Sequence, residues 1–489
     1  MIAQLPPEIW GQISEHLRGP DLIPLMGVNQ TFMHHAMKAK YRELNLASIN
    51  GPGQRALESI REKDWIAELV LSVHIGHVCV FTPTDSSSVG TSATPSSLYR
   101  KFKSLVTGSG MHMSPTSQGD RHVGKHHPHY NVTISPSAVI KLVSDVLPRL
   151  RNVTSLSVNY RYKSESLVYW RVCDSAAQYL PLGVDFPKLK DLCIRTTIKH
   201  QADGVAVPDI NILAHFINQF QNTLARLTLV NYEAGRNLNL KSMYDTLGYF
   251  PNLISIDISS TKTGYKGFIE RHAGTLQEIY CSVGDTFSDG LGPIEFNRLE
   301  TVNMIVNSRI STWWTSPSPF LKSILSTVKT LRIQGANSGE EITNFLASVT
   351  AISGRQGPRV DKLSISQFDT LTIETLLLIA STFSRLRSLE ITFYALVTEG
   401  VVGLIQPNET YPFNEEGQLE DVSFATKLKA TFLGVVWDLE DISINCYGHP
   451  DDSAVWGVMH ICSQIIPSIS SFNSTGNMRI PDNIKLPSN

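Results

Sequence analysis

The sequence predicts an α/β protein in which a short helical module precedes a long solenoid, a horseshoe with a concave parallel sheet. Three observations predict this fold class. The first fifty residues carry a dense helical pattern. An apolar triplet of the form apolar-x-x-apolar-x-apolar then recurs through the rest of the 489-residue chain. The spacing of these triplets is irregular but repetitive, which is typical of stacked units rather than of one globular core.

The N-terminal segment predicts three short helices. Ile9, Ile13 and Leu17 fall four residues apart, which places them on one face of the first helix. Gly19-Pro20 then breaks the chain. The residues expected at the helix starts are Pro6, Pro7, Asp21 and Asn29. So small a module cannot bury all of its apolar surface, and the remainder must meet the rest of the chain or a partner.

The residues of this segment also carry a family resemblance. They are Leu5-Pro-Pro-Glu-Ile-Trp10, Ile13, Leu17, Asp21-Leu22, Leu25, Val28-Asn29 and Phe32. With them, residues 4–46 resemble the F-box motif, especially its fungal versions. The resemblance implies docking onto a Skp-family linker protein and, through it, a cullin scaffold of a ubiquitin ligase. It implies that the linker contacts are Leu5, Pro6, Ile9, Ile13, Leu17, Leu22 and Val28.

The triplets mark the predicted strands of the solenoid. From position 153 their first anchors are 20 to 36 residues apart, about 29 on average. The anchors are Val153/Leu156/Val158, Leu189/Leu192/Ile194, Leu224/Leu227/Leu229, Leu253/Ile256/Ile258, Leu276/Ile279/Cys281, Leu299/Val302/Met304, Val328/Leu331/Ile333, Val360/Leu363/Ile365, Leu386/Leu389/Ile391, Leu419/Val422/Phe424 and Leu439/Ile442/Ile444, with an earlier copy at Ile66/Leu69/Leu71.

This rhythm resembles leucine-rich repeats, in which each unit offers a short strand followed by a return segment. Helical returns are predicted at Asp209–Thr223, Gly339–Ser353 and Leu371–Ser384. The asparagine that such repeats commonly place after the strand is almost absent, with Asn307 as its one match. An all-α solenoid is the alternative, but short, β-branched anchors with a period of two favour strands.

Residues 82–137 interrupt the repeats. This stretch is rich in Ser, Thr, Gly, Pro and His, and such a composition predicts a mostly disordered polar insertion. The predicted organisation is therefore 1–46 for the helical module, 47–81 for a first repeat or connector, 82–137 for the insertion and 138–489 for the solenoid.

Two motifs inside the insertion invite a functional interpretation. Gly119 to Lys125 fits the first seven positions of a phosphate-binding loop, but His126 stands where Ser or Thr would hold magnesium, and no strand precedes it. Four histidines at short spacing could hold zinc, although a disordered loop seldom pre-organises such a site. They are His122, His126, His127 and His129. The sequence predicts no metal, no cofactor and no catalytic residues.

Composition narrows the class of protein. Forty-two basic against 44 acidic residues give a net charge of −2, which disfavours a nucleic-acid partner. The six cysteines are scattered, the N-terminus lacks the pattern of a signal peptide, and no apolar run reaches the length of a membrane helix. These observations predict an intracellular protein, cytoplasmic or nuclear or both, without a membrane partner.

The side chains between the buried anchors are expected on the concave face. Those singled out as substrate-binding candidates are Arg195, Arg226, Tyr280, Asn303, Arg332, Glu390, Asp421 and Asp441. They predict a basic start grading into an acidic end, which suits a bipolar protein partner; a merely solvated face is the alternative. Trp313-Trp314 are a candidate aromatic anchor.

Three functional hypotheses follow. The first is a non-enzymatic substrate receptor of a Skp–cullin–F-box ubiquitin ligase, with an unknown protein substrate on the repeats. The second is an interaction scaffold outside any ligase, in which the helical module only caps the solenoid. The third, an enzyme that uses the histidine-rich insertion, has the least support from the sequence.

Overall fold

The computed structural model describes most of the predicted solenoid and the helical module. The described residues are 6–46, 51–75, 136–162, 184–198, 211–231, 240–259, 264–283, 294–306, 319–335, 338–354, 357–396, 428, 430–432, 437–447 and 453–479. Several sequence predictions lie outside them. These are Leu5, residues 82–135 of the predicted insertion with the phosphate-loop-like stretch 119–125 and the four histidines, Asn307, Trp313, Trp314, the triplet Leu419/Val422/Phe424 and Asp421.

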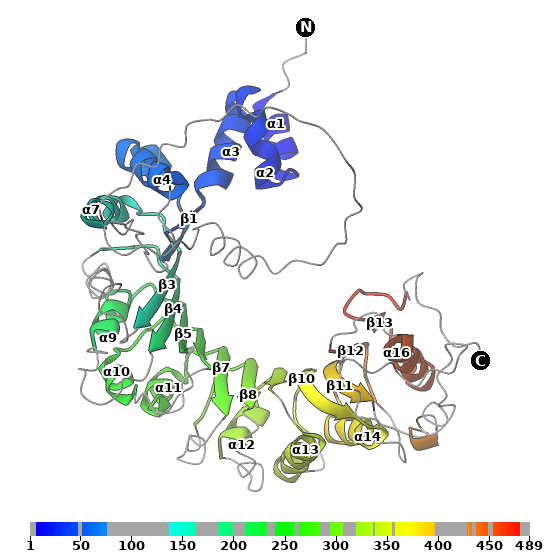
Figure 1. Cartoon of the computed structure of the whole chain (residues 1–489). Helices are drawn as coiled ribbons and strands as arrows, with labels where there is room; N and C mark the ends of the chain where they lie inside the picture. The colour runs from blue at the N-terminus through cyan, green and yellow to red at the C-terminus, as the bar shows by residue number, and fades with distance from the viewer. Residues whose placement is uncertain are drawn as a thin grey trace, which may run out of the picture.

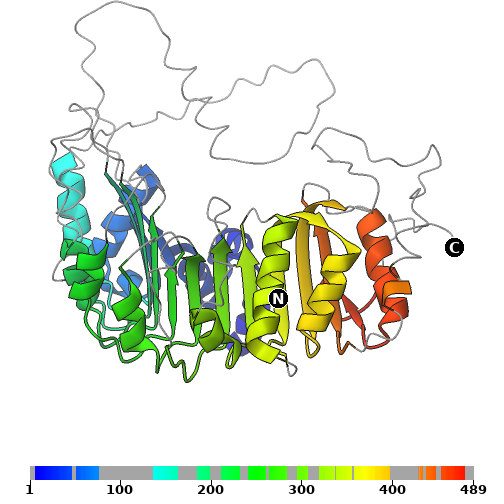
Figure 2. The same ribbon diagram turned by 90° about the horizontal axis from the view of Figure 1, so that it is seen from below.

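The described strands form one parallel sheet of 13 strands in which spatial order follows chain order. The strands are β1 (Glu43–Asn45), β2 (Ser72–Ile75), β3 (Ser155–Tyr162), β4 (Asp191–Ile198), β5 (Arg226–Asn231), β6 (Ser255–Ile258), β7 (Glu278–Val283), β8 (Thr301–Val306), β9 (Thr330–Gln334), β10 (Lys362–Leu371), β11 (Ser388–Leu396), β12 (Asp441–Cys446) and β13 (Ser471–Phe472). Figure 1 shows the sheet as the inner lining of an arc, and Figure 2 shows the strands side by side along it.

The apolar triplets hold these strands in register. Leu156 on β3 lies opposite Leu192 on β4, which lies opposite Leu227 on β5, and the same alignment continues strand by strand. All of these anchors are buried in one continuous core that runs the length of the sheet. Because successive side chains of a strand point to opposite faces, the intervening positions face away from this core. Ten predicted triplets, from Val153 to Ile444, are confirmed as the strands β3 to β12.

Backbone hydrogen bonds join the units where each strand begins. The carbonyl of Gln277 accepts the N–H groups of both Glu300 and Thr301, at 2.8 and 2.9 Å. The carbonyl of Glu300 accepts the next two N–H groups in the same way, from Lys329 and Thr330. The same double acceptance occurs at each step between neighbouring strands, from the carbonyl of Arg42 to that of Glu440. This backbone joint connects the units without the side-chain asparagine that the repeats lack.

Helices cover the outer face of the arc (Figure 1). They are α4 (Gly51–Glu62), α5 (Asp64–Ala67), α7 (Pro136–Val146), α9 (Asn211–Asn218), α10 (Lys241–Thr246), α11 (Lys266–His272), α12 (Pro319–Leu325), α13 (Gly339–Ser353), α14 (Ile373–Thr382) and, at the C-terminal end, α16 (Ser453–Ile465), with a 3-10 turn η2 (Leu147–Arg149). Ser338 and Glu341 form a reciprocal capping box that fixes the start of α13. The three predicted helical returns are confirmed as α9, α13 and α14.

The N-terminal module consists of α1 (Pro7–Glu15), α2 (Gly19–Leu22), the 3-10 helix η1 (Ile23–Gly27) and α3 (Gln30–Tyr41). Asn29 caps α3 as predicted, because its side chain accepts the N–H of Phe32 at 2.9 Å. Asp21 was predicted to cap the second helix, and this was wrong: α2 begins at Gly19, and Asp21 pairs with Arg18 at 3.0 Å. Proline at the start of a helix loses no hydrogen bond, so Gly19-Pro20 begins α2, whereas α1 already ends at Glu15.

The module has a small core of its own. Leu22, Phe32 and Ala36 are buried together, and the ring of Trp10 lies 5.3 Å from that of Phe32. This cluster is separate from the core of the sheet. The end of α3 connects the two, because Tyr41 is buried in the sheet core. The module therefore folds around its own side chains at one end of the arc (Figure 1).

The sheet differs from the sequence prediction at two places. Leu44 was assigned to the helical segment, but it is the buried centre of β1. The earliest triplet was predicted with Ile66, Leu69 and Leu71 as anchors, whereas β2 buries Val73 and leaves Leu71 exposed. The triplet beginning at Leu419 lies outside the described residues; β11 and β12, which flank it in the chain, pair directly with each other.

No described helix combines the length and the apolarity that a membrane crossing requires.

Candidate interaction surfaces

The linker contacts implied by the F-box resemblance occupy different environments in the module. Pro6, Ile9 and Ile13 are exposed, and Val28 is exposed as well, at 56%. Leu17 is half-buried against the module core. Leu22 is 4% exposed within that core, so it packs the module and has no free surface for a contact. The structure thus separates the implied set into exposed and packing residues.

Helix α1 presents an apolar face without a partner among the described residues. Ile9 and Ile13, one helical turn apart, are 39% and 38% exposed. Trp10 points instead toward Phe32. Ile23, Val28 and Met33 on the following elements are exposed as well. Apolar residues of this size are seldom left uncovered in so small a module, and their exposure is typical of a protein-binding surface.

The second surface is the concave face of the sheet. The described substrate-binding candidates are placed on it by the strand register: Arg195 on β4, Arg226 on β5, Tyr280 on β7, Asn303 on β8, Arg332 on β9, Glu390 on β11 and Asp441 on β12. Tyr280, Asn303 and Arg332 lie directly opposite one another on three neighbouring strands. Glu390 lies three strands beyond Asn303, and Asp441 lies four strands beyond it, so these two carboxylates belong to a separate part of the face.

A hydrogen-bonded network occupies the middle of this face. Glu278 accepts the hydroxyl of Tyr280 at 2.6 Å and that of Ser255 at 2.9 Å. Burial raises the pKa of the Tyr280 phenol, and the hydrogen bond and charge of Glu278 raise it further. Asp257 acts in the same direction, whereas Arg332 opposes it. The phenol is therefore a stable hydrogen-bond donor rather than an acid.

Asn303 lies beside this network and is a buried polar residue of β8. Its side chain is only 4% exposed, and its Oδ1 has no hydrogen-bond partner among the described residues. Its neighbours in the register are Tyr280 and Arg332. A buried amide oxygen without a partner carries a free-energy cost, and a donor from a bound molecule would remove it.

The charges on the concave face do not form the predicted gradient. Arg226 pairs with Asp191 at 2.7 Å near the supposedly basic start. Asp257 and Glu278 follow in the middle, and Arg332 comes after them. The prediction of a basic start grading into an acidic end was wrong, because it left out the first residues of the strands, several of which are acidic. The observed face alternates in sign over short distances.

Nucleophilic side chains meet on β2, β3 and β4. His74, Ser157 and Cys193 lie opposite one another, and Nε2 of His74 is 3.3 Å from the amide nitrogen of Asn159. Burial raises the pKa of the Cys193 thiol and lowers the pKa of His74. A raised thiol pKa disfavours the thiolate that a nucleophilic cysteine needs. Among the described residues, no group of three or more His, Cys, Asp or Glu is arranged to hold a metal ion.

Two exposed tyrosines at the C-terminal part of the sheet were missed by the sequence analysis. The rings of Tyr394, on β11, and Tyr447, directly after β12, lie 4.9 Å apart. Both side chains are exposed. A signal was present, because each tyrosine stands eight positions after the first anchor of its triplet, Leu386 or Leu439. Exposed aromatic pairs are frequent at protein-binding surfaces.

No protein-family model matches the chain, and no curated protein matches its sequence.

Proposed function

We propose that the protein is a substrate-recognition subunit of a Skp–cullin–F-box ubiquitin ligase. In this proposal the N-terminal module is an F-box that docks onto a Skp-family linker, and the curved sheet consists of irregular leucine-rich repeats that bind a protein substrate. The chain positions its substrate and leaves the chemistry to other subunits of the ligase.

One observation carries the proposal. The module closes a small core around Leu22, Phe32 and Ala36 and still leaves Ile9, Ile13 and further apolar side chains exposed. A segment that served only as a cap would merge its apolar residues with the core that it covers. The separate core and the uncovered face of α1 favour a module that meets another protein.

The repeats support the second half of the proposal. The parallel strand in each unit, the anchors in register and the returns on the convex side are typical of leucine-rich repeats. Such a fold displays a broad concave surface rather than a deep pocket. On that surface the Tyr280–Glu278 pair, Asn303 and Arg332 offer aromatic, amide and guanidinium groups, which are suited to protein recognition.

The linker interaction is tested by pull-down of the full-length protein with a purified Skp-family linker. The variant Ile9→Asp/Ile13→Asp places two charges on the exposed face of α1 and should lose binding by at least tenfold, since burying unpaired charges costs several kcal/mol. Both positions are exposed, so the fold should remain intact by circular dichroism. The matched control is Trp65→Asp/Met478→Asp, two exposed apolar positions elsewhere, which should bind normally.

Failure of the unmodified protein to bind a linker that captures another F-box protein would rule out the ligase proposal. The scaffold hypothesis also predicts that the protein does not bind the linker. One contact favours that hypothesis, because Tyr41 at the end of α3 is buried in the sheet core. The scaffold version predicts that removal of residues 1–40 lowers the thermal midpoint of the repeats. The ligase version predicts that the midpoint of the repeats is nearly unchanged, because the two cores are separate.

A further inference from the structure

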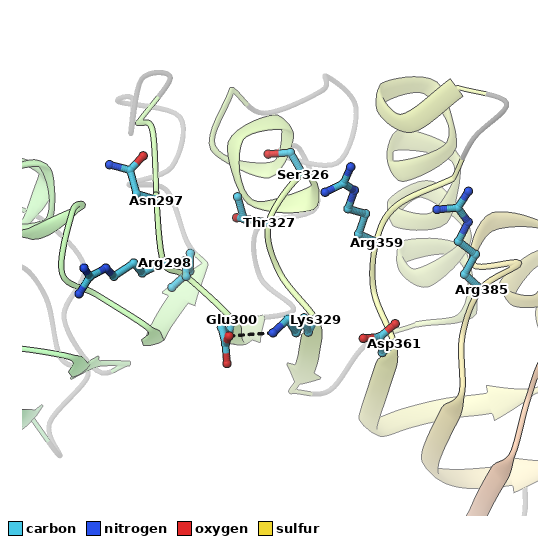
Figure 3. A pocket seen from close by; sticks show the side chains of 10 residues that line it. Asn297, Arg298, Glu300, Ser326, Thr327, Lys329, Arg359, Asp361 and Arg385 are labelled. Atoms are coloured by element: carbon cyan, nitrogen blue, oxygen red, sulfur yellow. Dashed lines mark hydrogen bonds and ion pairs between the residues drawn. The ribbon is translucent and has the colours of Figure 1, made fainter.

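A groove of about 480 Å³ lies at the edge of the sheet where β8 to β11 begin. Its walls are the segments that lead into these strands, so parallel pairing brings together residues 297–300, 326–329, 359–361 and 385. The groove is apart from the concave candidates, which lie within the strands. Figure 3 shows it with its side chains.

Positive charge dominates the groove. Four of its lining residues are cationic: Arg298, Lys329, Arg359 and Arg385. Two are anionic, Glu300 and Asp361. Lys329 lies 2.8 Å from Glu300, and Figure 3 shows this pair at the base of the groove. The hydrogen bond and charge of Glu300 raise the pKa of Lys329, and Asp361 adds to this effect. Lys329 is thus already paired with Glu300.

The three arginines are not compensated in this way. Among the described residues, no carboxylate lies within ion-pair distance of Arg298, Arg359 or Arg385. Arg359 and Arg385 precede neighbouring strands and extend side by side in the same direction in Figure 3. Arg298 lies on the other side of the Glu300–Lys329 pair, and its side chain extends away from that pair in Figure 3. Like charges held side by side repel each other, and an anion between them would remove this repulsion.

We infer that this groove binds an extended, carboxylate-rich segment of a partner protein, with Arg359 and Arg385 as the central contacts and Arg298 at the flank. The planar guanidinium group matches a carboxylate with two parallel hydrogen bonds. Neighbouring strands are about 4.8 Å apart, so three strand steps extend over roughly 14 Å, which an extended peptide covers with four to five residues.

Nucleic acid fits the groove less well. None of its ten lining residues is aromatic, so no side chain offers a stacking platform for bases. Glu300 and Asp361 would also repel a continuous phosphate backbone. A single small anion is too short to reach from Arg298 to Arg385. The site is independent of the proposed ligase role, since neither the module nor the concave face contributes to it.

The experiment measures fluorescence anisotropy of a labelled peptide of about six glutamates with the full-length protein, a length that exceeds the groove slightly. Saturable binding is expected. The variant Arg359→Gln/Arg385→Gln should weaken it at least tenfold, because it removes two charge-assisted hydrogen-bonding groups from the groove. The matched control Lys141→Gln/Arg151→Gln removes the same charge from exposed positions outside the groove and should bind like the unmodified protein.

Three outcomes would overturn the inference. One is absence of saturable binding to the glutamate peptide. Another is equal weakening in both variants, which would indicate attraction to the total charge rather than to the groove. The third comes from two further probes, a peptide with phosphoserine in place of glutamate and a single-stranded RNA. If either of these binds through the arginine pair and the glutamate peptide does not, the ligand is a phosphate and not a carboxylate.

Discussion

The imidazole of His272 accepts a hydrogen bond from the backbone N–H of Phe250 at 2.9 Å. Its Nε2 is the acceptor, so the proton of the neutral ring resides on Nδ1, which lies 2.7 Å from the carbonyl of Phe268. The side chain is fully buried among aromatic rings. This one histidine therefore joins α11 to the segment that leads into β6, and only in its neutral form.

The variant His272→Phe should lower the free energy of unfolding by about 1–3 kcal/mol, because the N–H of Phe250 loses its acceptor inside the core. Chemical denaturation at neutral pH measures this loss. A matched control is His460→Phe, a half-buried histidine on α16. An unchanged denaturation midpoint for His272→Phe would contradict the assigned hydrogen bond.

The same histidine predicts a pH dependence of stability. Burial lowers the pKa of His272 from its ordinary value of 6.5. Between the folded-state value and 6.5, the unfolded chain binds more protons than the folded one, so stability falls as pH drops below about 6.5. Above that pH the contribution is fully present. Denaturation from pH 7.5 to 5 should show a steeper loss for the unmodified protein than for His272→Phe.

The separate core of the N-terminal module predicts separate unfolding. Phe32→Ala should cost about 3–5 kcal/mol within the module, which exceeds what so small a core can withstand. Hydrogen exchange should then show loss of protection in α1 and α3, whereas strands β3 to β12 keep theirs. Loss of protection throughout the sheet would show that the two cores unfold as one.

Gly264 allows the chain to approach α10 closely. Its φ is +91°, and a Cβ there would lie 2.5 Å from the Cα of Lys241. Gly264→Ala should therefore destabilise the protein by about 2 kcal/mol or more, through strain and overlap together. Gly274→Ala is the control, since a Cβ there meets nothing within 4 Å. Thermal unfolding of the two variants should differ clearly.

The Tyr280 phenol should ionise above its ordinary pKa of 10.0, since burial and Glu278 both raise its pKa. The ultraviolet titration of the unmodified protein minus that of Tyr280→Phe isolates this group. Glu278→Gln should move the midpoint down, whereas Arg332→Gln should move it up, because Arg332 lowers the pKa. Circular dichroism at each pH verifies that the sheet remains folded. Shifts of the same sign in both variants would contradict the network.

The strands were predictable because their signal is local. Each of β3 to β12 contains two buried anchors separated by one residue, a pattern visible in any single unit. The bounds of α13 were predicted as observed, because Ser338 and Gly354 mark its ends. The alternation of buried residues and the residues that begin and end a helix are local in the sequence, so both can be predicted without knowing the fold.

The errors arose where tertiary context decides. Leu44 was expected in a helix and Leu71 as an anchor, but Leu44 is buried at the centre of β1 and Leu71 is exposed, because the pairing of β1 with β2 fixes which residues face the core. The predicted charge gradient failed for a similar reason: Asp191 and Arg226 are 35 positions apart and meet only through strand pairing. The basic groove required the same long-range register and could not be found in the sequence.

The paired backbone hydrogen bonds between neighbouring strands determine which substitutions and insertions the chain tolerates at these joints. Each joint uses two N–H groups and one carbonyl of the backbone, so the joint itself requires no particular side chain and excludes only proline at its donor positions, because proline has no N–H. Because the joint involves only the residues at the strand starts, it does not depend on the length of the chain between two strands. Neighbouring units can therefore gain or lose whole segments and still pair in the same sheet.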